Sequence, residues 1–124
     1  MPIILSLLFA CGPQPLEFAT SVEGCQNVEF DQTAEPTLEY SAENPVQVWL
    51  NGVWLPQDSV LDASVSSEDG IITVSEAWTE GVSEDTFCFA PTVTFEDAGA
   101  GRYEVFWYRD GDDIAFDSVV FEVE

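Results

Sequence analysis

The sequence predicts an all-β sandwich, and three observations support this fold class. Short runs rich in Val, Thr, Phe, Tyr and Trp alternate with clusters of Gly, Pro, Asn and Asp. No segment shows the apolar periodicity of an amphipathic helix. Hydrophobic residues make up 46% of the 124 residues and aromatic residues 13%. We therefore expect one folded domain with one core, despite the acidic composition.

The chain opens with an apolar run, Ile3 to Ala10, that ends directly before Cys11. The run is shorter than the roughly 20 apolar residues of a membrane-spanning helix, and it resembles the apolar region of a signal peptide. Leu8-Phe9-Ala10-Cys11 resembles the lipobox of bacterial lipoproteins. The resemblance implies cleavage before Cys11, a lipid on Cys11, and a protein anchored at the outer membrane or cell surface. The alternative is a buried first strand with a core cysteine.

This resemblance divides the chain into a signal peptide (1–10), a lipid-anchored tether (11–18) and a β-sandwich domain (19–124). It also assigns Cys11 to lipid and leaves Cys25 and Cys88 as a pair. An exported chain lies where disulfides persist, so we expect these two cysteines to be joined. The alternative is two buried thiols.

The clearest local pattern is a hairpin formed by residues 46–50, Asn51-Gly52 and residues 53–55. Asn-Gly tolerates the positive φ angles of a type I′ turn. In this register Trp49 lies opposite Trp54, and the two form a cross-strand pair on one face. The opposite, aliphatic face is expected to meet the core. It consists of Val46, Val48, Leu50, Val53 and Leu55.

A second hairpin is predicted at the end of the chain. Residues 102–108 form its first strand, Asp110-Gly111-Asp112 its turn, and residues 114–123 the return strand. Tyr103, Val105 and Trp107 share one face of the first strand, and Glu104, Phe106 and Tyr108 share the other. Phe116 and Phe121 have opposite parity, so both point inward only if a bulge intervenes near Asp117-Ser118.

Several of these segments resemble immunoglobulin-like sandwiches. Residues 38–45, Leu-Glu-Tyr-Ser-Ala-Glu-Asn-Pro, followed by the Asn51-Gly52 hairpin, resemble strands B, C and C′. Glu96-Asp97-Ala98-Gly99 and then Tyr103 resemble the corner that leads into strand F. Residues 102–124 also resemble the end of bacterial PKD-type domains. The resemblance implies an immunoglobulin-like antiparallel β-sandwich with strands C and F side by side in one sheet.

The sequence departs from that family at its core positions. Tyr40 and Val105 stand where the family has its two cysteines, and Val48 stands where it has its core tryptophan. A Cys25–Cys88 bond would therefore be a different link, from the N-terminal strand to the strand before the corner. Residues 57–85 are long for this fold and are expected to hold extra strands, including one over 71–74.

The net charge of −22 comes from 24 acidic residues against Arg102 and Arg109, without Lys or His. Binding to nucleic acid or to anionic membrane surfaces needs cations, so both are excluded. The absence of His removes the serine triad and the commonest zinc ligand, and the absence of Lys removes Schiff-base chemistry. We therefore predict a non-catalytic protein without a cofactor. A saline habitat and calcium binding are two explanations of the acidic surface.

The strongest candidate site is an aromatic patch formed by Trp49, Trp54, Phe106 and Tyr108. With strands C and F in one sheet, these side chains would share its outward face. Flat aromatic clusters suit stacking on sugar rings or contact with a protein partner. The predicted function is a surface interaction module for a protein or glycan ligand. The alternatives are a carbohydrate-binding module and a structural accessory domain of an envelope complex in which this face is covered.

Two further patterns concern the carboxylates. Asp110, Asp112 and Asp113 surround a glycine, which suits calcium, but the same residues are also common in hairpin turns. Paired carboxylates could in principle catalyse glycoside hydrolysis. Among 24 acidic residues some pair meets any spacing by chance, so this pattern does not indicate an enzyme.

Overall fold

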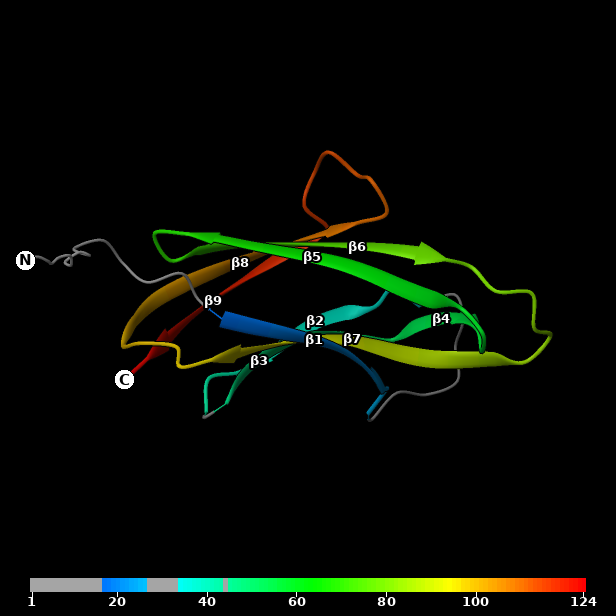
Figure 1. Ribbon diagram of the computed structural model, residues 1–124, viewed down its shortest axis with the longest axis horizontal. Coiled ribbons are helices and arrows are strands. Elements are labelled where there is room, and N and C mark those ends of the chain that lie inside the picture. The colour runs from blue at the N-terminus through cyan, green and yellow to red at the C-terminus, as the bar shows by residue number, and fades with distance from the viewer. Residues whose placement is uncertain (1–16, 27–33, 44) are drawn as a thin grey trace, which may run out of the picture.

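Two β-sheets lie face to face in the computed structural model, which describes residues 17–26, 34–43 and 45–124 (Figure 1). The strands of these residues are β1 (Glu17–Gly24), β2 (Thr37–Ser41), β3 (Val46–Asn51), β4 (Val53–Pro56), β5 (Val60–Glu68), β6 (Ile71–Thr79), β7 (Thr86–Glu96), β8 (Gly101–Arg109) and β9 (Asp117–Val123). The first sheet has the order β1-β7-β3-β2, with β4 also paired to β7. The second sheet has the order β5-β6-β8-β9. The predicted all-β sandwich is confirmed.

Strand pairing is antiparallel except between β6 and β8, which run parallel. β1 begins at Glu17, before the domain start predicted at residue 19, because its residues pair in register with β7 from Glu96 onward. The strand expected over 71–74 is present as the first part of β6.

The core lies between the two sheets and follows the alternation of each strand. Its buried apolar residues are Leu38, Val46, Val48, Leu50, Val53, Ile72, Val74, Phe89, Val93, Phe95, Val105, Trp107 and Phe121. Four of the five residues of the predicted aliphatic face are among them, and Leu55 packs against them. Tyr103 packs beside Val105 and Trp107, so the predicted inward face of β8 is also confirmed.

The predicted hairpin at Asn51-Gly52 is wrong, because β3 and β4 both pair with β7 instead of with each other. Trp49 lies opposite Thr92, and Val53 lies opposite Phe89. Leu50, Asn51 and Gly52 therefore face only two residues of β7, which is the arrangement of a β-bulge. Gly52 adopts a φ of 107°, so the positive φ angle that the sequence indicated serves a bulge rather than a turn.

The two-residue hairpin of this fold lies instead at Asp69-Gly70, between β5 and β6. Glu68 pairs with Ile71, and the two turn residues have φ angles of 53° and 80°. Two positive φ angles in a two-residue connection are the signature of a type I′ turn, for which Asp-Gly is a preferred sequence. This hairpin joins β5 and β6, which are the extra strands that the long segment 57–85 was expected to hold.

The chain crosses from the first sheet to the second at the corner between β7 and β8. The Tyr103 hydroxyl donates a hydrogen bond to the Gly99 carbonyl oxygen at 2.7 Å, which resembles a tyrosine corner. The expectation that the strand of Trp49 and the strand of Phe106 lie side by side is wrong. β3 belongs to the first sheet and β8 to the second, and β8 pairs with β6 and β9.

The final hairpin is shorter on its return side than predicted. β9 begins at Asp117 instead of Ile114, which is 81% exposed in the connecting loop. The β8–β9 register is regular over all of β9, so no bulge occurs at Asp117-Ser118. Phe116 packs against the core from just before the strand, where its N–H donates to the Trp107 carbonyl oxygen at 2.7 Å.

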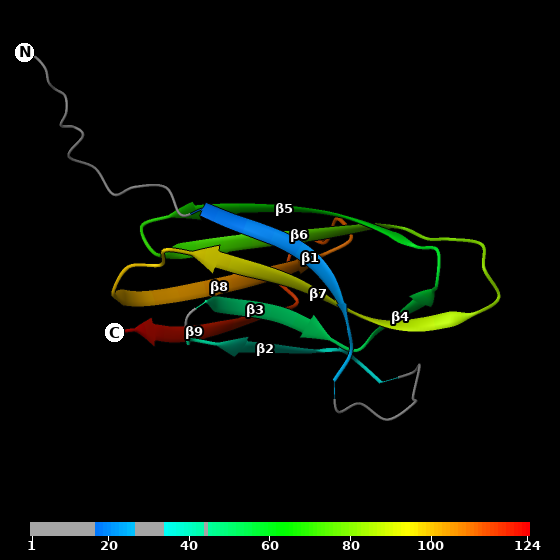
Figure 2. The same cartoon turned by 60° about the horizontal axis from the view of Figure 1, so that its bottom comes forward.

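The two long edges of the sandwich differ in how they are closed. At one edge β2 meets β9, and at the other β1 meets β5 (Figure 2). The Phe121 ring fills the first edge between Tyr40, at 5.3 Å, and Tyr103, at 5.8 Å between ring centroids. At the second edge Phe18 and Val22 point inward beside Phe95 and Pro91, yet remain 41% and 42% exposed.

Candidate functional site

The outer face of the first sheet carries a hollow around Trp49. Trp49 points outward because its neighbours Val48 and Leu50 are both fully buried. The hollow has a volume of about 600 Å³. We call it the Trp49 hollow, and it is lined by Glu23, Gly24, Gln26, Gln47, Trp49, Asn51, Ala90 and Thr92. One aromatic ring thus lies among amide, carboxylate and hydroxyl side chains, a combination that suits a polar ligand with a flat apolar face.

The rim of the Trp49 hollow is fixed by the side chain of Asn51. Its Nδ2 donates to the Gln26 carbonyl oxygen at 2.8 Å, and its Oδ1 accepts from the Gln26 N–H at 3.2 Å. The Asn51 side-chain amide therefore binds both main-chain polar groups of Gln26, as a residue of a neighbouring β-strand would. Asn51 is 7% exposed, and both of its side-chain polar atoms are hydrogen-bonded. These bonds offset the cost of removing the amide from water.

The disulfide between Cys25 and Cys88 holds the same rim, with 5.5 Å between the two Cα atoms. Cys25 follows β1 directly, and its N–H donates to the Cys88 carbonyl oxygen at 3.3 Å. The bond is therefore a link between adjacent strands of one sheet, from the N-terminal strand to the strand before the corner. Because Gly24 and Gln26 flank Cys25, the disulfide also fixes one wall of the hollow.

The four predicted patch residues do not share one face. Trp49 and Trp54 lie on the outer face of the first sheet, whereas Phe106 and Tyr108 lie on the outer face of the second. The assumed C–F pairing is absent, so the two pairs are on opposite sides of the sandwich. All four side chains are half-buried. Trp49 and Trp54 both lie opposite β7, Trp49 in register with Thr92 and Trp54 with Cys88. They do not lie on two strands paired with each other, so the predicted cross-strand Trp pair is also wrong.

Phe106 and Tyr108 lie among small hydroxyl side chains on their own face. Phe106 is in register with Thr73 on one side and Ser118 on the other, and Tyr108 is in register with Ser75. The second face is therefore a sheet surface with two half-buried rings, whereas the Trp49 hollow lies on the first face.

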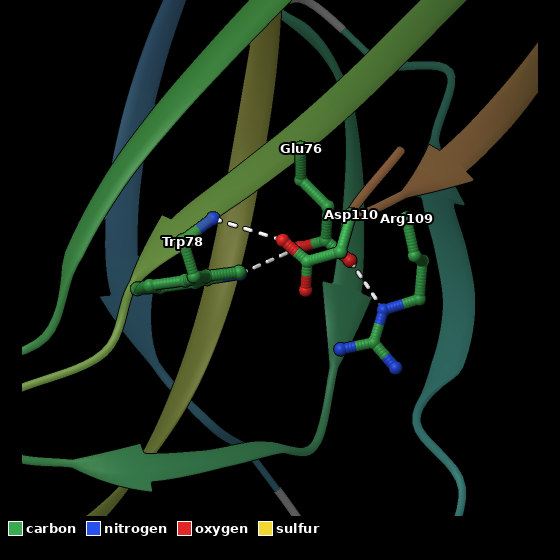
Figure 3. Close-up of polar contacts among 4 residues, drawn as sticks. All are labelled: Glu76, Trp78, Arg109 and Asp110. Carbon is green, nitrogen blue, oxygen red and sulfur yellow. Dashed lines mark hydrogen bonds and ion pairs between the residues drawn. The ribbon is translucent and has the colours of Figure 1, made fainter. Parts of the chain in front are cut away.

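A buried carboxylate links the ends of β6 and β8 (Figure 3). Glu76 Oε1 accepts a hydrogen bond from Arg109 Nε, and Oε2 accepts one from Trp78 Nε1 at 2.9 Å. The Glu76 side chain is fully buried, whereas the Arg109 side chain is 25% exposed. Removing one partner of a buried ion pair costs about 3–5 kcal/mol, and the exposure of Arg109 favours the lower value. Both carboxylate oxygens are thus hydrogen-bonded, and the cluster ties β6 to the end of β8.

Asp110 completes this cluster. Its N–H donates to the Glu76 carbonyl oxygen at 2.9 Å, and its Oδ1 accepts from the Trp78 N–H at 3.0 Å. Of the two roles that the sequence left open for Asp110, calcium ligand or turn residue, this carboxylate has the structural one: it holds the start of the β8–β9 loop. Within residues 17–26, 34–43 and 45–124, no three His, Cys, Asp or Glu side chains are placed to hold a metal ion, and this includes Asp112 and Asp113.

A second carboxylate organises the loop before β7. Asp58 Oδ1 accepts from the Ser83 N–H at 2.9 Å, and Oδ2 accepts from the Val82 N–H at 3.1 Å. These backbone hydrogen bonds lower the pKa of Asp58 below its ordinary value. A Cβ at Gly81 would lie 2.0 Å from Asp58 Oδ1, so only glycine fits there.

Sequence reasoning missed Glu76, Asp58 and the rim role of Asn51. Glu76 carried a usable signal, because it continues the inward positions of Ile72 and Val74 in one strand. An acidic residue at an inward position requires a buried partner, and the chain has only two cations. The roles of Asp58 and Asn51 depend on loops that meet only in the folded chain.

The predicted signal peptide and Cys11 lie outside the described residues, as does most of the tether. In the part of the chain that the structure describes, there is no helix long and apolar enough to cross a membrane. Comparison of the chain with family models, curated proteins and solved structures gave no match.

Proposed function

We propose that this chain is a non-catalytic interaction module that binds its ligand in the Trp49 hollow. The observation that carries the proposal is the juxtaposition of an outward Trp49 ring with Glu23, Gln26 and Gln47 around one hollow. A rim fixed by the disulfide and by Asn51 supports it, because a preorganised site loses less conformational entropy on binding. Phe106 and Tyr108 are not part of this contact surface.

The proposal also includes export and a lipid anchor at Cys11. The Cys25–Cys88 disulfide supports export, because such bonds persist in oxidising compartments. Intact-mass measurement of protein purified from the native host tests the anchor. We expect a chain that begins at Cys11 with added acyl mass. A chain that retains Met1 and carries no acyl mass would contradict it.

Carbohydrate binding is a second candidate, and the composition of the Trp49 hollow favours it. A sugar ring can stack on an indole while its hydroxyls bond to amide and carboxylate side chains. Glu23 and Gln26 supply such groups beside Trp49.

We also propose that the sandwich is of the immunoglobulin-like subtype. The Tyr103–Gly99 hydrogen bond supports this subtype, although the observed strand order differs from that of the family.

Binding screens with matched variants test the proposed function. The folded chain is applied to a glycan array and to an array of bacterial envelope proteins, and each positive is titrated by calorimetry. We expect Trp49→Ala to weaken binding at least tenfold, since a central aromatic anchor dominates such contacts. Phe106→Ala, on the opposite face, is the control and should leave affinity unchanged.

Three outcomes separate the alternatives. A glycan that loses affinity with Trp49→Ala identifies a carbohydrate-binding module, and a protein that does so identifies a protein interaction module. Collisional quenching, compared between the parent chain and Trp49→Phe, reports the exposure of Trp49 alone. A Trp49 that resists quenching without any ligand, together with unfolding caused by Trp49→Ala, would favour a structural accessory domain.

A further inference from the structure

β1 has one hydrogen-bonded neighbour in the described structure, namely β7. All eight residues of β1 pair with β7 in an unbroken register. In such a ladder every second residue directs its N–H and C=O away from the partner, so β1 presents a row of these groups along its other side. Every residue of β1 is exposed.

Four of the devices that protect an edge strand are missing from β1, whose charged residues, Glu17 and Glu23, both point outward. Such devices are a lysine, a proline, a bulge, or a charge that points inward. The sequence of β1 is Glu-Phe-Ala-Thr-Ser-Val-Glu-Gly, and its inward residues Phe18, Thr20 and Val22 carry no charge. An extended segment could therefore pair with this edge without a steric or inward-charge penalty.

Apolar surface is left open on the inner side of the same edge. Phe18 and Val22 face the core side of the sheet, yet more than two fifths of each side chain is exposed. At the opposite edge, Phe121 on the same inner side is 5% exposed beneath Tyr40. One additional strand beside β1 would place alternate side chains over Phe18 and Val22.

The charge around this edge is of one sign. β1 contributes Glu17 and Glu23, β5 contributes Asp62 and Glu68, and neither strand has a cation. The two arginines of the chain are both in β8, which β6 separates from β5. A second copy of this chain, with a net charge of −22, would be repelled, whereas a cationic segment would be attracted.

We propose that β1 is the docking edge for an extended, cationic segment of a partner protein, which adds to the first sheet as a further strand. Its main chain pairs with β1, its apolar side chains cover Phe18 and Val22, and its alternate basic side chains meet Glu17 and Glu23. Glu23 borders both this edge and the Trp49 hollow, but the main-chain edge of β1, Phe18 and Val22 do not line the hollow, so the inference goes beyond the proposed function and can fail independently of it.

The test uses the full chain and a synthetic peptide of about seven alternating Lys and Val residues as the probe. Calorimetry at about 0.15 M salt measures affinity, and amide hydrogen exchange locates the contact. We expect binding with slowed exchange in β1. The same peptide N-methylated at every residue has no main-chain N–H to donate along either edge and should bind at least tenfold more weakly.

Two variants with the same change in charge separate pairing from simple attraction. Thr20→Lys places a cation on the inner side of β1, and Ser21→Lys places one on the outer side. We expect Thr20→Lys to weaken peptide binding at least tenfold and Ser21→Lys to weaken it about twofold. Phe106→Ala, on the outer face of the other sheet, should leave peptide affinity unchanged.

Several results would overturn the proposal. Equal affinity of the plain and N-methylated peptides, or equal losses with the two Lys variants, would show that charge alone attracts the peptide. Protection outside β1 would place the contact elsewhere. Absence of any binding would refute the docking edge, and a concentration-dependent dimer with slowed exchange in β1 would identify a second copy as the occupant.

Discussion

The two long edges of this sandwich contrast in packing although the same two sheets form both. At the β2–β9 edge, Phe121 lies between two tyrosine rings and is 5% exposed. At the β1–β5 edge, Phe18 occupies a comparable inward position but is 41% exposed. Apolar parity along a strand therefore places a side chain on the core side of a sheet without burying it. Burial at an edge depends on the residue that the facing sheet supplies.

The two edges are also held by different forces. The β2–β9 edge relies on aromatic packing between sheets, whereas β1 is held by pairing with β7 and by the Cys25–Cys88 disulfide within one sheet. The disulfide thus holds β1, all of whose residues are exposed. Loss of each kind of contact should accordingly affect one edge more than the other.

The largest effect is expected from removal of the disulfide, by Cys25→Ser with Cys88→Ser in a Cys11→Ser background. The bond closes a loop across 63 residues, for which chain entropy predicts a loss of about 4 kcal/mol in the free energy of unfolding. Urea unfolding measures the loss. We expect faster amide exchange in β1 than in β9, and an equal increase in both strands would contradict separate support of the two edges.

A matched pair of truncations compares the edges directly. Phe121→Ala should cost about 3 kcal/mol, because it removes a buried ring and two aromatic contacts. Phe18→Ala should cost about 1 kcal/mol, because much of that ring already lies in water. Both are read from denaturant midpoints at constant slope. Similar costs would show that the open edge is packed as tightly as the closed one.

Added salt should raise the melting temperature by several degrees between about 0.05 M and about 1 M NaCl, because the net charge of −22 repels itself. Calorimetric scans measure this shift. Salt should slow exchange more in β1 than in β9, since Arg102 lies in register with Glu122 beside β9 and β1 has no such neighbour. A flat response of the melting temperature would contradict the charge argument.

The smallest effect concerns Asp58, which lies away from both edges. Its pKa is lower when folded than when unfolded, so its contribution is present above the unfolded value of about 3.8 and is lost as the pH falls through the folded value. Amide chemical shifts of Val82 and Ser83, followed by NMR, should move in that acidic range. In Asp58→Asn they should be insensitive to it, while β1 and β9 respond equally.

Much of the fold could be predicted from local pattern. The alternation in residues 46–55 identified an inward aliphatic face, the parity of Tyr103, Val105 and Trp107 was correct, and Cys25 and Cys88 are joined. These features depend on near neighbours or on covalent chemistry. The shared face of Leu50 and Val53 also depended on the bulge at Gly52, since a regular strand would place residues three apart on opposite faces.

Sheet membership could not be predicted, and the candidate site depended on it. Asn-Gly is compatible with a type I′ turn and with a bulge, because both use a positive φ angle. The choice at Asn51-Gly52 is decided by β7, which offers pairing to both β3 and β4 and lies about forty residues away in the sequence. For the same reason Phe106 and Tyr108 were wrongly expected on one face with Trp49 and Trp54, although they lie in the other sheet.

The bulge at Gly52 makes a single residue responsible for the phase of a strand. Because it adds one residue opposite β7, Leu50 and Val53 both point inward although they are three apart, and Trp49 and Trp54 both point outward although they are five apart. If the bulge were lost while Gly52 remained, regular alternation would turn Val53 toward water and Trp54 toward the core, whereas deletion of Gly52 would give a regular ladder in which Val53 still points inward. The sorting of tryptophan from aliphatic side chains in this sheet therefore depends on the bulge that absorbs this residue as much as on the identity of the side chains.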